Sequence, residues 1–193
     1  MKKCVFKGLD QNIFCEKLPN GLYVILVPFK NKRNYYVNYT TKYGSVDLDF
    51  ICNNEKYSSP IGIAHFLEHK VFEQENGVDP FTFFSKTGTG CNAGTSYRKT
   101  SYFIYGINDL EKNLDYLISF VNSPYFTDEN VEKEKGIIIE EIKMYEDLPD
   151  ATCEILMDST FFNGSTFAHD ILGSEQSVLN ITRSQILNYL KEN

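Results

Sequence analysis

The sequence contains no tryptophan and only three histidines among its 193 residues. It also lacks the roughly 20 consecutive apolar residues that a membrane-spanning helix needs, because its longest early apolar run is GLYVILVPF at 21–29. No apolar stretch follows the initial MKK, as a secretory signal would require. The formal net charge is −7 and there is no lysine–arginine run, which argues against a phosphate-binding surface. We therefore expect no nucleic-acid partner and no membrane partner.

Cysteine is also sparse and shows no pattern. The five cysteines are odd in number, scattered and without C-x-x-C spacing; they are Cys4, Cys15, Cys52, Cys91 and Cys153. This usage is more typical of reduced thiols than of a disulfide framework. It predicts a soluble protein with a cytoplasmic localisation.

The composition is that of one globular domain, predicted over residues 1–193, with 42% hydrophobic and 23% charged residues. Segments typical of strands come mainly first and are followed by segments typical of helices. The expected strands are 12–18, 21–28, 35–45, 90–96 and 100–107, and the expected helices are 60–73, 79–88, 110–123, 128–147, 149–162 and 181–193. This order predicts an α+β fold, in which helices cover one face of a largely antiparallel sheet.

Two of the three histidines, His65 and His69, lie four residues apart in PIGIAHFLEHKVFE, with Glu68 between them. Ser59 as the N-cap and Pro60 at the first helical position predict that this segment begins a helix. Residues i and i+4 share a helix face, so both imidazoles can bind one zinc ion. The order H-x-x-E-H is the inverzincin pattern. Histidines on a solvated helix surface are the alternative, but the segment is mostly apolar.

A catalytic zinc needs a third protein ligand, and the helix predicted at 128–147 offers one. At about 100° per residue, Glu134 and Glu141 both project onto the apolar face of this helix, whereas Glu140 projects onto the polar face. Buried carboxylates need a cation or a metal. A pairing with lysine or tyrosine could explain one of them, but two on one face are harder to explain. We predict that Glu141 is the third ligand and that Glu134 orients a ligand histidine or the active-site water.

Three blocks together resemble the pitrilysin/insulinase family of zinc peptidases, which includes the mitochondrial processing peptidases. GIAHFLEHKVFE is similar to the zinc helix of that family, NAGTSYRKTSYF to its edge strand and EKEKGIIIEEI to its distal glutamate helix. FSKTG and YFTDENVEKEKG resemble a bacterial branch of zinc-protease-like proteins. The resemblance covers about residue 16 to the C-terminus. It implies the fold of the metallohydrolase domain of a processing peptidase, and only the N-terminal catalytic domain.

The resemblance also implies roles for the residues of these motifs. One zinc ion per chain is held by His65, His69 and Glu141, and Glu68 is the general base that acts on the zinc-activated water. Glu134 corresponds to an additional catalytic-site glutamate of the family. Manganese or cobalt could substitute for zinc in vitro.

Three further residues are implied in substrate binding. Asn92 and Ala93 correspond to edge-strand residues that hold the substrate backbone, and Phe72 to an aromatic residue near the scissile bond. The alternatives are a turn residue after the glycines for Asn92 and core packing for Phe72. Arg98 departs from the family pattern, since many relatives have an acidic residue there.

These observations predict a zinc-dependent endopeptidase domain that hydrolyses extended peptides. Family members have a second homologous domain or a partner subunit, which supplies an arginine and a tyrosine near the zinc. The sequence stops inside a predicted helix, and we expect it to be part of something longer. Two alternatives remain: a peptide-binding subunit that does not cleave, and a small-molecule zinc enzyme resembling the S-ribosylhomocysteine lyases, for which Cys91 or Cys153 would supply a thiol. His169 is expected at the surface or in a loop.

Overall fold

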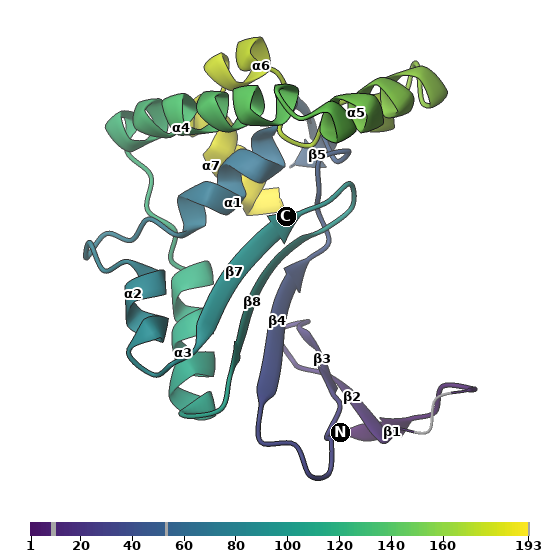
Figure 1. Ribbon diagram of the computed structural model, residues 1–193, viewed down its shortest axis with the longest axis vertical. Coiled ribbons are helices and arrows are strands. Elements are labelled where there is room, and N and C mark those ends of the chain that lie inside the picture. The colour runs from purple at the N-terminus through teal and green to yellow at the C-terminus, as the bar shows by residue number, and fades with distance from the viewer. Residues whose placement is uncertain (9–10, 53, 193) are drawn as a thin grey trace. The chain divides into compact units, whose positions relative to one another are not determined.

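The computed structural model describes residues 1–8, 11–52 and 54–192 and contains two compact units, Met1–Asn34 and Tyr35–Asn193. The first unit is a three-stranded antiparallel sheet (Figure 1), formed by β1 (Lys2–Cys4), β2 (Ile13–Lys17) and β3 (Tyr23–Leu26) in that order. Strands were predicted at the positions of β2 and β3, whereas β1 was not predicted. That the chain acts as one domain, as expected from the sequence, stays a prediction.

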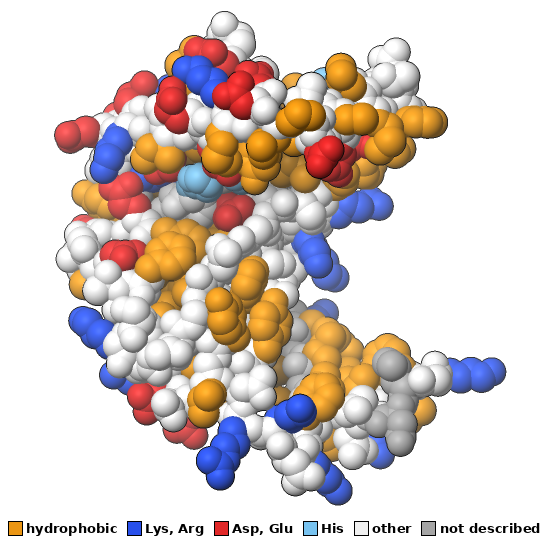
Figure 2. Space-filling view, in the orientation of Figure 1, with side chains coloured by type: hydrophobic (Ala, Val, Ile, Leu, Met, Phe, Trp, Pro, Cys, Tyr) orange, Lys and Arg blue, Asp and Glu red, His pale blue; other side chains and the backbone are white. Residues whose placement is uncertain are grey.

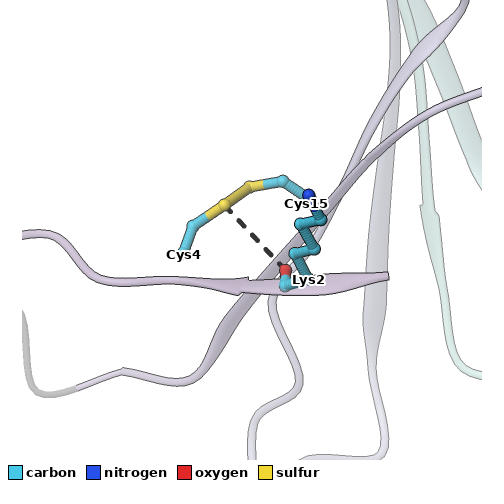
Figure 3. The surroundings of a disulfide bond; sticks show 3 residues. All are labelled: Lys2, Cys4 and Cys15. Carbon is cyan, nitrogen blue, oxygen red and sulfur yellow. Dashed lines mark hydrogen bonds between the residues drawn. A yellow bond between two sulfur atoms is a disulfide. The ribbon is translucent and has the colours of Figure 1, made fainter.

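A disulfide joins Cys4 and Cys15 in this unit (Figure 3), so the prediction of reduced thiols is wrong for this pair. Antiparallel pairing places Cys4 opposite Ile13 and Cys15 opposite Lys2, so the two cysteines are diagonal neighbours on one face. Their Cα atoms are 6.2 Å apart, within the range for a disulfide. Because the pairing depends on β1, which the sequence did not reveal, the spacing alone gave no signal.

The second unit is built on a sheet with the strand order β4-β8-β7. Its strands are β4 (Tyr35–Thr41), β7 (Gly90–Thr95) and β8 (Thr100–Gly106), all antiparallel to their neighbours. Side chains alternate between a buried face and an outward face, as a half-buried strand requires. β7 pairs with β8 alone among the described strands and is therefore an edge of the sheet.

Helices cover the buried face of this sheet (Figure 1). α1 (Ile63–Val71), α2 (Pro80–Ser85) and α3 (Leu110–Val121) contact the strands, and α4 (Asp128–Glu146) packs on α1. The remaining helical elements are α5 (Pro149–Phe161), η1 (Thr166–Ala168), α6 (Glu175–Leu179) and α7 (Arg183–Glu192). The predicted α+β architecture, with helices on one face of an antiparallel sheet, is confirmed. Among the described helices, none combines the length and the apolar character that a membrane span requires.

The start of the motif helix differs from the prediction, because α1 begins at Ile63 rather than at residue 60. Its N-cap is Gly62, whose φ of 90° is a left-handed conformation that favours glycine. A Cβ atom at Gly62 would lie 2.4 Å from the carbonyl oxygen of Leu172, so the position also needs glycine for space. Ser59, the predicted N-cap, lies before the helix, and its backbone N–H donates to the carbonyl oxygen of Leu48. The turn before α1 is therefore set by a close tertiary contact.

A short hairpin and two short helical elements were not predicted. The hairpin consists of β5 (Asp49–Cys52) and β6 (Glu55–Ser58), in a region for which neither strand nor helix was predicted. Stacking of Phe50 on Tyr57, with ring centroids 5.4 Å apart, holds its two strands together. η1 and α6 were also missed. The predicted capping box of the last helix is present between Thr182 and Gln185, and residue 193 of that predicted helix lies outside the described residues.

Candidate metal centre

The packing of α1 against α4 brings together two imidazoles and one carboxylate. His65 and His69 lie one turn apart on α1, and Glu141 faces them from α4, with potential ligand atoms all within 4.8 Å of one another. Oε2 of Glu141 is 3.7 Å from Nε2 of His65 and 3.4 Å from Nε2 of His69. Tetrahedral ligands at the zinc distance of about 2.0–2.1 Å lie about 3.4 Å from one another. The three residues therefore fit a zinc ion in number, chemistry and spacing.

His65 is the more buried of the two imidazoles, with 7% of its surface exposed. Burial, together with the nearby charge of His69, lowers the pKa of His65 to about 4. Its imidazole is therefore neutral at pH 7, which is the form that binds a metal. Nδ1 of His65 is buried without a hydrogen-bond partner among the described atoms. In Figure 2, a patch of histidine surface (pale blue) lies over α1, with acidic side chains (red) next to it.

Glu134 lies beside the site and contacts its second histidine. Its Oε1 accepts a hydrogen bond of 3.0 Å from Nδ1 of His69, which leaves Nε2 of that ring directed to Glu141. This is the arrangement expected for a carboxylate that orients a ligand histidine. Burial lowers the pKa of His69, but the hydrogen bonds to Glu134 and Glu141 outweigh burial and raise it to about 9. The hydrogen bond with His69 in turn lowers the pKa of Glu141.

Glu68 projects from α1 toward the sheet and is held by a residue that the sequence did not single out. The hydroxyl of Thr95, on β7, donates a hydrogen bond of 2.7 Å to Oε2 of Glu68. Burial raises the pKa of Glu68, with a smaller contribution from Glu141, and the bond from Thr95 opposes this shift. The sequence offers one indication of this contact. Side chains alternate between the two faces of a strand, so Thr95 lies on the same face of β7 as Ala93, toward the helices.

The predicted substrate-binding residues lie on two different elements. Asn92 and Ala93 belong to β7, the sheet edge, so Asn92 is a strand residue rather than a turn residue. Its side-chain oxygen accepts a hydrogen bond of 2.8 Å from the backbone of Ala93. Phe72, at the end of α1, stacks on Phe81 with centroids 4.9 Å apart and packs on Phe120 at 5.5 Å. Those contacts correspond to the packing alternative for Phe72.

Neither thiol offered for a small-molecule enzyme contacts the site. Cys91 lies four residues from Thr95 along β7, which is about 13 Å at the rise of a strand. Cys153 is an exposed residue of α5. His169, the third histidine, is exposed and lines a groove beside α5 with Tyr145 and Asp170. The S-ribosylhomocysteine lyase alternative therefore lacks its cysteine.

Cys91 and Cys153 should differ strongly in reactivity. Burial raises the pKa of Cys91 to about 12, and the charge of Asp79 adds to this shift, so almost no thiolate is present at pH 8. We expect iodoacetamide to label Cys153 at least about 10-fold faster than Cys91, because the thiolate is the nucleophile. Peptide mapping by mass spectrometry during a timed reaction measures both rates. Faster labelling of Cys91 would contradict this assignment.

The sequence of this chain is similar to a known protein family and to curated proteins. Residues 54–175 match the family model described as Insulinase (Peptidase family M16). The chain is 42% identical to the uncharacterized zinc protease YmfH of Bacillus subtilis (strain 168), over 95% of this chain and 43% of that protein.

Two solved structures are similar over nearly the whole chain. A putative M16-like peptidase from Alicyclobacillus acidocaldarius superposes with a TM-score of 0.90 at 38% identity, over 96% of this chain and 44% of that one. An inactive domain of peptidase M16 from Pseudomonas fluorescens superposes with a TM-score of 0.76 at 16% identity, over 92% and 42%, which shows a common fold. The chain thus spans less than half the length of these relatives.

Proposed function

This chain belongs to the insulinase family of peptidases, M16, and we propose that it is the zinc-bearing domain of an endopeptidase that hydrolyses extended peptides. The observation that carries the proposal is the donor set of two imidazoles and one carboxylate, with Glu68 beside it. Sets of two histidines and a glutamate hold zinc in known peptidases and leave a position open for water or substrate.

One zinc ion per chain would be held by His65, His69 and Glu141. When bound, zinc polarises a peptide carbonyl and lowers the pKa of a coordinated water to about 7. The protein prepares the site for it in two ways. His65 is kept neutral by burial, and Glu134 holds the ring of His69 through Nδ1, so that Nε2 points toward Glu141 and the position of the metal.

Glu68 is the proposed general base. It takes a proton from the attacking water and passes it to the leaving amine. Thr95 engages one carboxylate oxygen, Oε2, so that the other oxygen remains for the proton transfer. The raised pKa of Glu68 suits this role, because a base works best when its pKa is near the working pH.

The substrate would bind to the exposed edge of the sheet. β7 is an edge of the sheet among the strands that the structure describes, and a peptide in extended conformation can add to it as a further strand. Asn92 and Ala93 lie on this edge, and Thr95 follows two residues later beside the proposed base. Because the bonds are to the main chain, such binding tolerates many sequences. The substrate class that follows is unstructured peptide.

A second homologous domain or a partner subunit would complete the catalytic unit. The relatives are more than twice as long as the matched region, since the chain covers 43% of YmfH and 44% of the Alicyclobacillus protein. The family resemblance implies that the other half supplies an arginine and a tyrosine to the substrate. Full activity is therefore expected only in the assembled protein.

A peptide-binding domain that does not cleave is the second candidate. It is favoured by the existence of M16 domains without activity, as the name of the Pseudomonas fluorescens structure states of that protein. The presence of both histidines, Glu68 and Glu141 in this chain favours the enzyme instead. The two candidates agree on peptide binding and differ only in whether zinc-dependent cleavage follows.

Cleavage of an unstructured fluorogenic peptide tests the proposal, with the chain alone and together with a candidate partner domain. We expect dialysis against a chelator to lower the rate at least about 100-fold, because the metal supplies the Lewis acid, and one equivalent of zinc to restore it. A His169→Ala variant is the control, since His169 lies outside the site, and it should behave as wild type. Cleavage that survives chelation would contradict the proposal. Zinc-loaded protein that binds peptide but does not cleave it, even together with the partner domain, would favour the second candidate.

A further inference from the structure

Lys70 is a fully buried lysine beside the metal centre, and the proposed mechanism does not use it. It follows His69 directly on α1 and has 0% of its surface exposed. Lysine is rarely buried, because an ammonium group without partners loses its hydration. The groups that surround the ammonium group of Lys70 should therefore show what this lysine does in the site.

The ammonium group of Lys70 lies between α1 and the first turns of α4. It contacts the carboxylate of Glu73 and donates a hydrogen bond of 3.3 Å to the carbonyl oxygen of Asn130. It also lies 4.0 Å from Oε2 of Glu134. The other oxygen of that carboxylate, Oε1, is the one that accepts the hydrogen bond of 3.0 Å from His69. The carboxylate of Glu134 therefore bridges two consecutive residues of α1, one through each oxygen.

The neighbours of Lys70 on α4 are themselves fixed. Asn130 and Glu134 are four residues apart and share a helix face. Asn130 forms a capping box with Thr127: its side chain accepts from the backbone of Thr127 at 2.9 Å, and its own N–H donates to the threonine hydroxyl at 3.1 Å. The carbonyl that binds Lys70 thus belongs to a rigid helix start, and it holds the ammonium group within reach of Glu134.

We propose that Lys70 is a positioning residue of the metal centre, which holds the carboxylate of Glu134 against His69 so that Nε2 of that imidazole faces the metal. The inference rests on the proposed zinc site and adds a residue to it. The side chain of Glu134 is 12% exposed. Among the described ion pairs, this carboxylate has two cationic partners: the ligand histidine His69 and Lys70. Without the lysine, this largely buried carboxylate would have one described ion-pair partner instead of two.

The chain contains a matched control. Lys135, on α4, is also buried, with 7% of its surface exposed, and it also pairs with a glutamate three residues away, Glu132, at 2.6 Å. That pair involves no residue of the metal centre. Removing Lys135 thus reports the cost of losing a buried lysine, without an effect on Glu134.

The test measures zinc affinity by competition with a chromophoric chelator, in the wild type and in Lys70→Met, Lys135→Met and Glu134→Gln variants of the full chain. Changes in the groups behind a metal ligand typically cost about 10–100-fold in affinity. We expect Lys70→Met to weaken zinc binding about 10-fold and Lys135→Met to leave it unchanged. In the Glu134→Gln background, the Lys70→Met change should add less than about 2-fold, because its effect passes through Glu134. Thermal unfolding of the metal-free proteins reports the structural cost separately.

Two results would overturn the role of Lys70. One is wild-type zinc affinity in Lys70→Met, and the other is the same loss with and without Glu134, which would show an effect through folding alone. If Lys70→Met does not fold, Lys70→Gln replaces it with the same expectation, since glutamine can still bond to the Asn130 carbonyl but carries no charge. A wild type that binds no zinc would remove the proposed site itself, and with it this role.

Discussion

Replacing Glu141 by glutamine should remove zinc from the protein. Oε2 of Glu141 lies 3.7 Å from Nε2 of His65 and 3.4 Å from Nε2 of His69, and a neutral amide oxygen is a much weaker zinc ligand than a carboxylate. The loss of affinity should exceed the roughly 10–100-fold of a change behind the ligands. Elemental mass spectrometry of the purified protein should give about one zinc per chain for the wild type and almost none for the variant.

Glu140 provides the control at the adjacent position. Its carboxylate is exposed and pairs with Lys143 at 2.9 Å, and it forms no described ion pair with the histidines. The Glu140→Gln variant should therefore keep its zinc. The reverse result, with zinc lost in Glu140→Gln and kept in Glu141→Gln, would contradict the metal centre as the structure describes it.

The central part of the site could be predicted because it follows from helix periodicity. The four-residue spacing of His65 and His69 places both on one face of α1. The seven-residue spacing of Glu134 and Glu141 does the same on α4, and both glutamates reach His69. Periodicity alone does not show that these two faces meet. That step came from the need of a catalytic zinc for a third ligand, together with two carboxylates on an apolar helix face, and the resemblance to the family implied the same ligand.

The residues behind the site could not be predicted, because they depend on contacts between distant segments. Thr95 is 27 residues from Glu68, and nothing local marks its hydroxyl as the partner of that carboxylate. Nothing in the sequence singles out Lys70, which is fully buried and donates a hydrogen bond to the carbonyl oxygen of Asn130, 60 residues away. The projection of α4 places seven apolar residues on one broad arc with the two glutamates, and three of the seven are exposed: Ile137, Met144 and Tyr145. The surface that α1 and α6 cover is narrower than that arc.

Replacing Glu68 by glutamine should abolish peptide hydrolysis while leaving the zinc content unchanged. The amide has the same size and can still accept the hydrogen bond from Thr95, now 2.7 Å long, through its carbonyl oxygen. It cannot take a proton from water, and groups that transfer protons contribute about 10²–10⁴-fold to such rates. A loss of that order is expected in initial rates on a fluorogenic peptide, measured on the same samples as the zinc content.

Zinc content decides between two roles for Glu68. Loss of zinc in Glu68→Gln would show that Glu68 is a metal ligand. If the variant keeps both its zinc and its rate, the bond between Glu68 and Thr95 only connects α1 with β7. Glu75→Gln, a change of an exposed glutamate beyond the same helix, should alter neither measurement. Because Glu134 and Glu141 are both engaged by His69, whereas Glu68 is held by a neutral hydroxyl, Glu68 is the carboxylate of this site that is placed to exchange a proton with water. Loss of the rate with zinc retained is the result that this difference in partners predicts.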